Sequence, residues 1–213
     1  MKNIIRILLC STMLVWMTNS KAEIQFGFGL MAGQLDTSGT ETEGTAADTS
    51  VRNKSFEEAF AGADIFIENI FDNGFTVGLS YVPLNIDVGD GSRQDNAGGD
   101  VPGEADTGTR TASAEVADLV TLYTNVPLGG AGWYGLLGGH MATVETTENL
   151  PNSSYGNEDI TGYQVGLGKR VDKAKFELFY SDFEDISISS TGGNSNSVSA
   201  DADAVVLRLS IGF

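Results

Sequence analysis

Residues 201–213 read DADAVVLRLSIGF, a stretch in which apolar and polar residues alternate up to the last position. One alternate set is apolar and consists of Val205, Leu207, Leu209, Ile211 and Phe213. The other set carries a charge at Arg208, a hydroxyl at Ser210 and a glycine at Gly212. Because successive side chains of a strand point to opposite faces, this stretch predicts a β-strand with one apolar face.

Seven more segments have the same pattern, with about ten residues each and turn residues between them. They are residues 23–35, 58–69, 75–84, 113–125, 133–144, 160–171 and 175–183. In the fourth of these, the alternation places Leu119, Thr121 and Tyr123 on the apolar face, opposite Asp118. The frequent Gly, Ser, Thr, Asn and Asp residues disfavour helices. The chain is therefore predicted to be all-β.

The connections between these eight segments alternate in length. Long connections cover residues 36–56, 85–110, 145–159 and 185–200, and short ones cover residues 71–75, 126–132 and 171–174. The Asn73-Gly74 pair in the first short connection is a strong signal for a tight hairpin. An antiparallel up-and-down sheet with all its long loops on one rim follows, and this pattern is typical of a small transmembrane β-barrel.

The face opposite the apolar stripe decides between a membrane barrel and a soluble one. It carries the charged residues Asp64, Glu68, Asp118, Arg170, Glu177 and Arg208. A secreted, lipocalin-like barrel would have to hold these charges in its core, which is costly. In a membrane barrel the apolar residues face lipid and the charges can pair across the lumen. The sheet must then close, so we expect the first strand to pair with the last.

The first 22 residues have the layout of a cleaved secretory signal peptide. Lys2 and Arg6 precede an apolar run over residues 7–17, and the small residues Ser20 and Ala22 stand just before the expected cleavage point. That run is too short to cross a bilayer as a helix. Cleavage would leave one barrel domain, residues 23–213, without the single cysteine and with the formal net charge lowered from −17 to −20. Nucleic acid is an improbable partner for so acidic a chain.

The ending LRLSIGF, with Leu207, Leu209, Ile211 and Phe213 at alternate positions, is similar to the C-terminal assembly signal of bacterial outer-membrane proteins. With the eight segments, the chain resembles the small barrels of the OmpA-barrel, OmpX and OmpW-like type. The resemblance implies location in the outer membrane, contact with its lipid, insertion by the barrel assembly machinery and a monomeric state. It also implies that the long loops lie outside the cell. It implies no single activity, because such barrels serve as anchors, adhesins, channels or enzymes.

Catalytic, metal and cofactor sites are not expected. His140, the only histidine, could act as a general base with Ser80 or Ser181 and with Asp64 or Glu145. Lipid A deacylases in barrel walls use a short His-x-Ser spacing, which the sequence HMAT after position 139 does not match. The loop over residues 85–110 is acidic enough to make calcium binding conceivable, but its spacing is not that of an EF-hand.

Two further groups of residues have structural interpretations. The tyrosines and other aromatic residues near the segment ends suit the interfacial girdles of a membrane barrel, and Tyr123 and Tyr134 are included among them. Glycines inside the segments suit a crowded, narrow lumen better than a phosphate-binding loop, because no helix follows them.

Three functions remain open from the sequence. The first is a structural or surface-interaction role through the long acidic loops. The second is a narrow, porin-like channel for small solutes, which needs a continuous water path past the lumen charges. The third is a lipid-modifying enzyme, which would depend on His140 alone.

Overall fold

The computed structural model describes residues 22–45, 48–95, 108–149, 154–191 and 196–213. They form ten strands in one antiparallel sheet. The strands are β1 (Ala22–Thr45), β2 (Asp48–Phe71), β3 (Thr76–Tyr81), β4 (Ile86–Asp95), β5 (Gly108–Pro127), β6 (Trp133–Glu148), β7 (Glu158–Val171), β8 (Ala174–Phe183), β9 (Ile186–Ser189) and β10 (Ser197–Gly212). Among these residues, none forms a helix with the length and apolar character needed to cross a membrane. The predicted signal peptide lies outside the described residues.

The sheet closes into a ring because β1 pairs with both β2 and β10. The closing ladder begins at Gly27 opposite Gly212. Beside it, Phe26 and Phe213 exchange backbone hydrogen bonds of 3.3 and 2.8 Å. Eight strands make up the ring, in the order β1-β2-β3-β5-β6-β7-β8-β10. The predicted fold, an eight-stranded antiparallel up-and-down β-barrel, is confirmed, and each ring strand overlaps one of the eight predicted segments.

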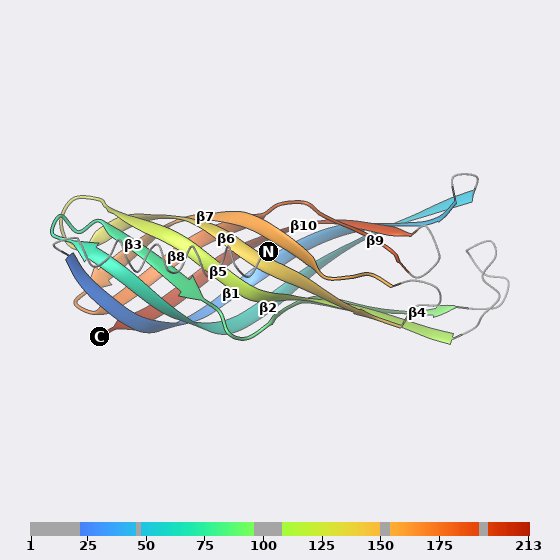
Figure 1. Ribbon diagram of the computed structural model, residues 1–213, viewed down its shortest axis with the longest axis horizontal. Helices are drawn as coiled ribbons and strands as arrows, with labels where there is room; N and C mark the ends of the chain where they lie inside the picture. Colours follow the sequence, from blue (N-terminus) through green and yellow to red (C-terminus); the bar gives the residue numbers. More distant parts are fainter. Residues whose placement is uncertain (1–21, 46–47, 96–107, 150–153, 192–195) are drawn as a thin grey trace.

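The tight turns and the C-terminal end lie together at one rim, on the left of Figure 1. At the opposite rim, the β1–β2 and β4–β5 hairpins project well beyond the barrel. These projections correct the prediction of long loops and of strands near ten residues. The β1–β2 ladder continues to Thr45 opposite Asp48, while β4 extends β5 and β9 extends β10. Ile86 and Val88 of β4 and Ile186 and Ile188 of β9 alternate with polar residues and are buried. The remaining sequence of the projections is polar and rich in Thr and Ser, so the strand pairing identifies it.

A β-bulge in β5 corrects the predicted facing of the fourth segment. The pairing of β5 with β6 shifts between Ala117 and Val120, and Asp118 in the bulge has φ 53°. The bulge adds a residue to β5 and so exchanges the two faces beyond it. As a result, Thr121 and Tyr123 are buried in the lumen instead of facing outward.

Glycines make room for the aromatic side chains that lie across the lumen. Gly78 is directly opposite Tyr123, and Gly168 is directly opposite Tyr134. A Cβ at either glycine would lie 2.3 Å from Cζ of the facing tyrosine. The narrow bore of an eight-stranded barrel therefore requires glycine at both positions.

The interior has two zones along the barrel axis. The zone near the tight turns holds charged and polar side chains such as Glu68, Lys175 and Arg208. The zone toward the long hairpins is packed with apolar side chains: Leu35, Val82, Ile86, Val116, Val144, Ile160, Ile188 and Ala204. The barrel is therefore lined by charges at one end and filled by an apolar core at the other.

Gly168→Ala tests the packing of tyrosine against glycine. We expect it to lower the free energy of unfolding by about 1–3 kcal/mol, because the new methyl group forces the Tyr134 ring out of its place. Urea unfolding of the refolded barrel measures this. Gly130→Ala is the control, since no atom lies within 4 Å of the Cβ there. Equal losses in the two variants would contradict the explanation.

Candidate functional site

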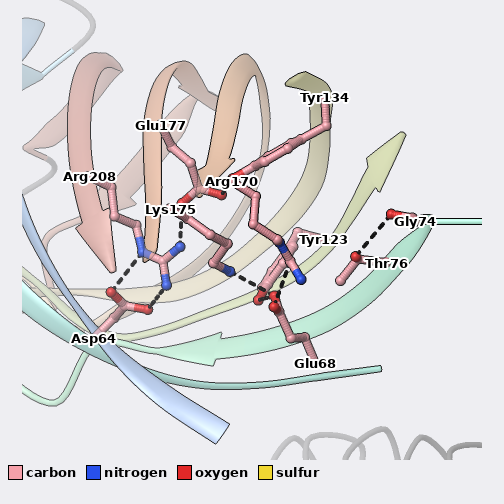
Figure 2. A network of polar contacts seen from close by, with 10 residues as sticks. All are labelled: Asp64, Glu68, Gly74, Thr76, Tyr123, Tyr134, Arg170, Lys175, Glu177 and Arg208. Carbon is pink, nitrogen blue, oxygen red and sulfur yellow. Dashed lines mark hydrogen bonds and ion pairs between the residues drawn. The ribbon is translucent and has the colours of Figure 1, made fainter. Parts of the chain in front are cut away.

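Six ionisable side chains meet in the lumen near the tight-turn rim, and we call them the lumen charge network. The three acids Asp64, Glu68 and Glu177 face the three bases Arg170, Lys175 and Arg208 (Figure 2). The acids come from β2 and β8, and the bases from β7, β8 and β10. Each strand presents alternate residues to the lumen, so four strands bring their charges to one level. The formal charges of the network sum to zero.

Arg208 joins two of the acids. Its Nε donates to Oδ1 of Asp64 at 2.9 Å, and its Nη2 donates to Oδ2 at 2.6 Å. Its Nη1 donates to Oε2 of Glu177. The planar guanidinium therefore pairs in bidentate fashion with one carboxylate and holds a second. Through Arg208, the closing strand β10 is tied to β2 and to β8.

Glu68 is the second centre of the network, with a side chain that is 0% exposed. Its Oε1 accepts from Nη2 of Arg170 at 2.7 Å, and its Oε2 accepts from Nζ of Lys175 at 2.7 Å. The Tyr123 hydroxyl donates to the same Oε2 at 3.0 Å. One carboxylate thus satisfies two cations, which compensates for the high cost of burying each charge alone.

Aromatic rings surround the buried cations. Nζ of Lys175 lies 4.1 Å from the centre of the Phe66 ring, and the Arg208 guanidinium lies 5.0 Å from the same ring. The Tyr134 hydroxyl donates to Oε1 of Glu177 at 2.8 Å. Ring faces attract cations, and they also exclude water from the ion pairs. Chemically, the arrangement is a charge-balanced set of ion pairs that reaches across the lumen.

Five of the six charges that the sequence assigned to the lumen lie in this network. Asp118 does not, and here the prediction is wrong. The bulge in β5 turns Asp118 outward, where it is exposed and accepts a hydrogen bond of 3.2 Å from the Tyr81 hydroxyl. The predicted girdle positions of Tyr123 and Tyr134 are also wrong, because both rings are buried in the lumen.

Lys175 belongs to the network but is not among the six charges predicted for the lumen. It occupies the same alternate set as Glu177, opposite the outward Phe176, so the signal was present in the alternation. Tyr123 and Tyr134 could not be found in this way. The bulge hides the phase of β5, and the glycine-rich β6 has no clear apolar face.

His140 lies in the lumen on the apolar side of the network. Its Nδ1 is 2.8 Å from Oγ1 of Thr121, and its Nε2 is 3.1 Å from Oγ of Ser181. The Phe183 ring stacks on the imidazole with 5.4 Å between ring centres. Of the partners considered from the sequence, Ser181 contacts the ring. The group that orients the imidazole is a threonine hydroxyl rather than a carboxylate, which departs from a Ser-His-acid triad.

The imidazole and both hydroxyls line an internal cavity of about 60 Å³. Most of the other lining residues are apolar, for example Leu35, Val116 and Phe179. Among the described residues, no group of three or more His, Cys, Asp or Glu side chains could hold a metal ion. Part of the acidic loop considered for calcium, residues 96–107, lies outside the described chain.

The terminal residues that resemble an assembly signal point out of the barrel. Leu207, Leu209, Ile211 and Phe213 are between 43% and 65% exposed. They continue the outward row of β10 down to the tight-turn rim, next to Phe28 of β1, whose ring centre is 6.2 Å from that of Phe213.

The fold and the site define a closed, eight-stranded antiparallel β-barrel with an ion-paired lumen. Neither a protein-family model nor the sequence of a curated protein matches this chain. Solved structures that are similar in fold include the outer membrane protease OmpT from Escherichia coli, with 9% identity over 89% of this chain and 97% of that chain (TM-score 0.45).

Two others are neisserial surface protein A and Ail, the attachment invasion locus protein of Yersinia pestis. The first has 8% identity over 87% of this chain and 97% of that chain (TM-score 0.41). The second has 11% identity over 85% of this chain and 98% of that chain (TM-score 0.34). These values support no argument about activity, and it is the strand pairing that establishes the barrel.

Glu68→Gln tests the lumen charge network. We expect it to lower the free energy of unfolding by about 3–5 kcal/mol, because two buried cations lose their carboxylate. Urea unfolding followed by fluorescence measures this. Glu57→Gln is the matched control on the same strand, and its exposed side chain should cost less than about 0.5 kcal/mol. A similar, small loss in both variants would show that the network contributes little.

Proposed function

We propose that this protein is an integral outer-membrane β-barrel with a closed lumen, and that it has a structural or surface-interaction role through its long hairpins. The observation that carries the proposal is a reversal of polarity along the barrel axis. Near the tight turns the apolar side chains point outward and the charges inward. Toward the hairpins the apolar side chains point inward and the acids outward.

The outward apolar side chains form a continuous belt around the tight-turn half. Its exposed members include Phe26, Phe28, Leu30, Ile65, Leu137, Val165, Leu167, Phe176, Leu178, Leu207, Leu209 and Ile211. An apolar surface of this extent is unfavourable in water and favourable against lipid. On β10 the belt runs from Val205 to Phe213. At about 3.3 Å per residue and a tilt near 40°, this span is about 20 Å tall, similar to the ~25 Å apolar band of outer-membrane barrels.

The belt ends at a row of acids. Asp203 on β10 is paired in register with Asp36 on β1 and with Asp182 on β8. From this level on, most outward positions are polar, and the interior holds the apolar core. A barrel that leaves the lipid at this row would continue into water with the ordinary arrangement of a soluble protein.

Two observations favour a closed lumen over the narrow channel. The lumen charge network joins strands across the bore with three paired acids and three paired bases. The apolar core then occupies the bore toward the hairpins, around the small cavity beside His140. A lipid-modifying activity has weaker support, because His140 and Ser181 face the lumen rather than the belt.

The surface role is supported by the hairpins themselves. The β1–β2 ladder continues for about nine residue pairs beyond Asp36, and β4 and β5 form a second projection that β3 does not reach. This paired structure is not needed to close the ring. Among the described residues, its exposed side chains are mostly polar, with Val51 as an exception, and include more acids than bases, which suits an outward, solvated face.

A closed lumen predicts the absence of steady conductance. We expect the refolded chain to give no discrete openings in a planar lipid bilayer, because no continuous water path passes the network and the core. A general porin refolded in the same way is the positive control. Reproducible single-channel steps from a barrel that is folded by heat-modified gel migration would contradict the proposal and favour the narrow channel.

The acid row predicts a pH effect on stability. Partial burial, and then the charges of Asp36 and Asp182, raise the pKa of Asp203 above 3.8. An acid with a raised pKa destabilises the folded state where it is ionised, and this penalty disappears as the pH falls through the raised value toward 3.8.

Asp203→Asn should therefore raise the free energy of unfolding at neutral pH, and the gain should vanish below pH 3.8. Urea unfolding at the two pH values measures the difference from the wild type. Asp72→Asn, in the tight turn between β2 and β3, controls for the loss of one negative charge. The expectation fails if Asp203→Asn has the same effect at both pH values.

A further inference from the structure

The basic residues of this acidic chain are concentrated at one place. Residues 22–213 contain nine Lys and Arg residues, and four of them lie between Lys169 and Lys175. This segment is the end of β7, the β7–β8 turn and the start of β8, at the tight-turn rim. Arg170 and Lys175 point into the lumen and are paired with Glu68. Lys169 and Lys173 are left outside the lumen charge network.

Lys169 is a cation on the lipid-facing side of the barrel. The alternation of β7 places it in the outward row with Leu167 and Val171, which are 56% and 50% exposed. Its cross-strand neighbour on β6 is Trp133, and Nζ lies 5.2 Å from the centre of that ring. Among the described residues, no carboxylate forms an ion pair with Lys169.

The surroundings of Lys169 suit a membrane interface. Trp133 is 48% exposed, and an indole ring at the edge of an apolar belt lies at headgroup depth. A lysine beside it can extend its ammonium group toward the headgroups while its stem stays in the belt. Lys173, exposed in the turn that follows, adds a second positive charge at the same rim. Asp172 is the acidic residue of this turn.

We propose that Trp133, Lys169 and Lys173 form a binding site for the phosphate headgroup of an anionic phospholipid at the tight-turn rim. A lysine ammonium binds phosphate as a point charge, and the indole packs against the glycerol and upper acyl chain. The proposal rests on the membrane location proposed above. It adds to that location the class of lipid and the residues that select it.

The opposite edge of the belt carries a row of acids. There Asp36, Asp182 and Asp203 stand side by side on three neighbouring strands. This row repels anionic headgroups, whereas Lys169 and Lys173 attract them locally at a rim that also carries Glu23, Asp72 and Asp172. The difference favours one orientation of the barrel in a bilayer whose anionic phospholipids are accessible at the tight-turn rim.

Trp133 allows the site to be tested by fluorescence. Trp16 lies in the predicted signal peptide, so the chain from residue 23 onward has Trp133 as its single tryptophan. This chain is refolded into vesicles of phosphatidylcholine and phosphatidylglycerol. In one type of vesicle the phosphatidylcholine carries brominated acyl chains, and in the other type the phosphatidylglycerol carries them. Bromine quenches an indole that it contacts, so the two vesicle types report which lipid lies next to Trp133. We expect phosphatidylglycerol to be enriched there about threefold or more over its bulk fraction, since each basic residue near the surface contributes ~1 kcal/mol.

Lys169→Gln and the pair Lys169→Gln/Lys173→Gln should reduce this enrichment stepwise toward the bulk fraction. Lys54→Gln is the matched control, because Lys54 also lies over an aromatic ring, 4.3 Å from the centre of Phe56, but near the other rim. Circular dichroism and heat-modified gel migration confirm that each variant is folded.

The possible outcomes distinguish a failure of the proposed lipid site from a failure of the proposed membrane location. No quenching by either brominated lipid would overturn the membrane location itself, and the lipid site with it. Equal quenching in proportion to the bulk lipid composition would leave the membrane location standing and overturn the lipid site. Enrichment that survives the loss of both lysines would also overturn the site as assigned here.

Discussion

The rest of the structure depends on closure of the sheet between β1 and β10. A sheet that crosses lipid cannot leave an edge, because unpaired backbone groups have no water to bond to. The ladder from Gly27 opposite Gly212 to Thr42 opposite Ser197 removes that edge. With eight strands in the ring, the bore is just wide enough to be filled by side chains. Everything inside the barrel is therefore constrained by a fixed and narrow space.

That space explains the composition of the lumen. Charges in a narrow bore must be paired, and the lumen charge network meets this condition with three acids and three bases that satisfy one another. The rings that shield the ion pairs need room, which Gly78 and Gly168 provide on the facing strands. Arg208 lies on the closing strand and binds Asp64 on β2, so the network also ties together strands on both sides of β1. The lumen charge network and the closure of the sheet therefore stabilise one another.

In the proposed membrane location, the two-zone interior follows from a change of solvent along the axis. Against lipid, apolar side chains are favourable outside and charges must be held within. Beyond Asp203 the same strands continue into water, and their apolar residues turn to the inside. Inward and outward positions still alternate along each strand. The apolar residues, however, change from the outward positions to the inward ones. A row of acids on one edge of the belt and lysines at the other give the two rims different electrostatic character.

The sequence by itself determined the ring. Strict alternation, as in residues 205–213, and the tight Asn73-Gly74 turn are local properties, and local properties are visible in a single chain. It also placed Asp64, Glu68, Arg170, Glu177 and Arg208 on the inward face, because their phase relative to the outward apolar residues is clear.

Only the tertiary structure decided the rest. The bulge at Asp118 changes the phase of β5 through its pairing with β6, and so Tyr123 moved from the expected girdle to the lumen. The outer parts of the long hairpins are strands because they pair with each other, since their mostly polar sequences carry little alternation. Which acid meets which base, and that Lys169 lies over Trp133, depends on the register between strands. Register is a property of pairs of strands, and a single strand's sequence does not contain it.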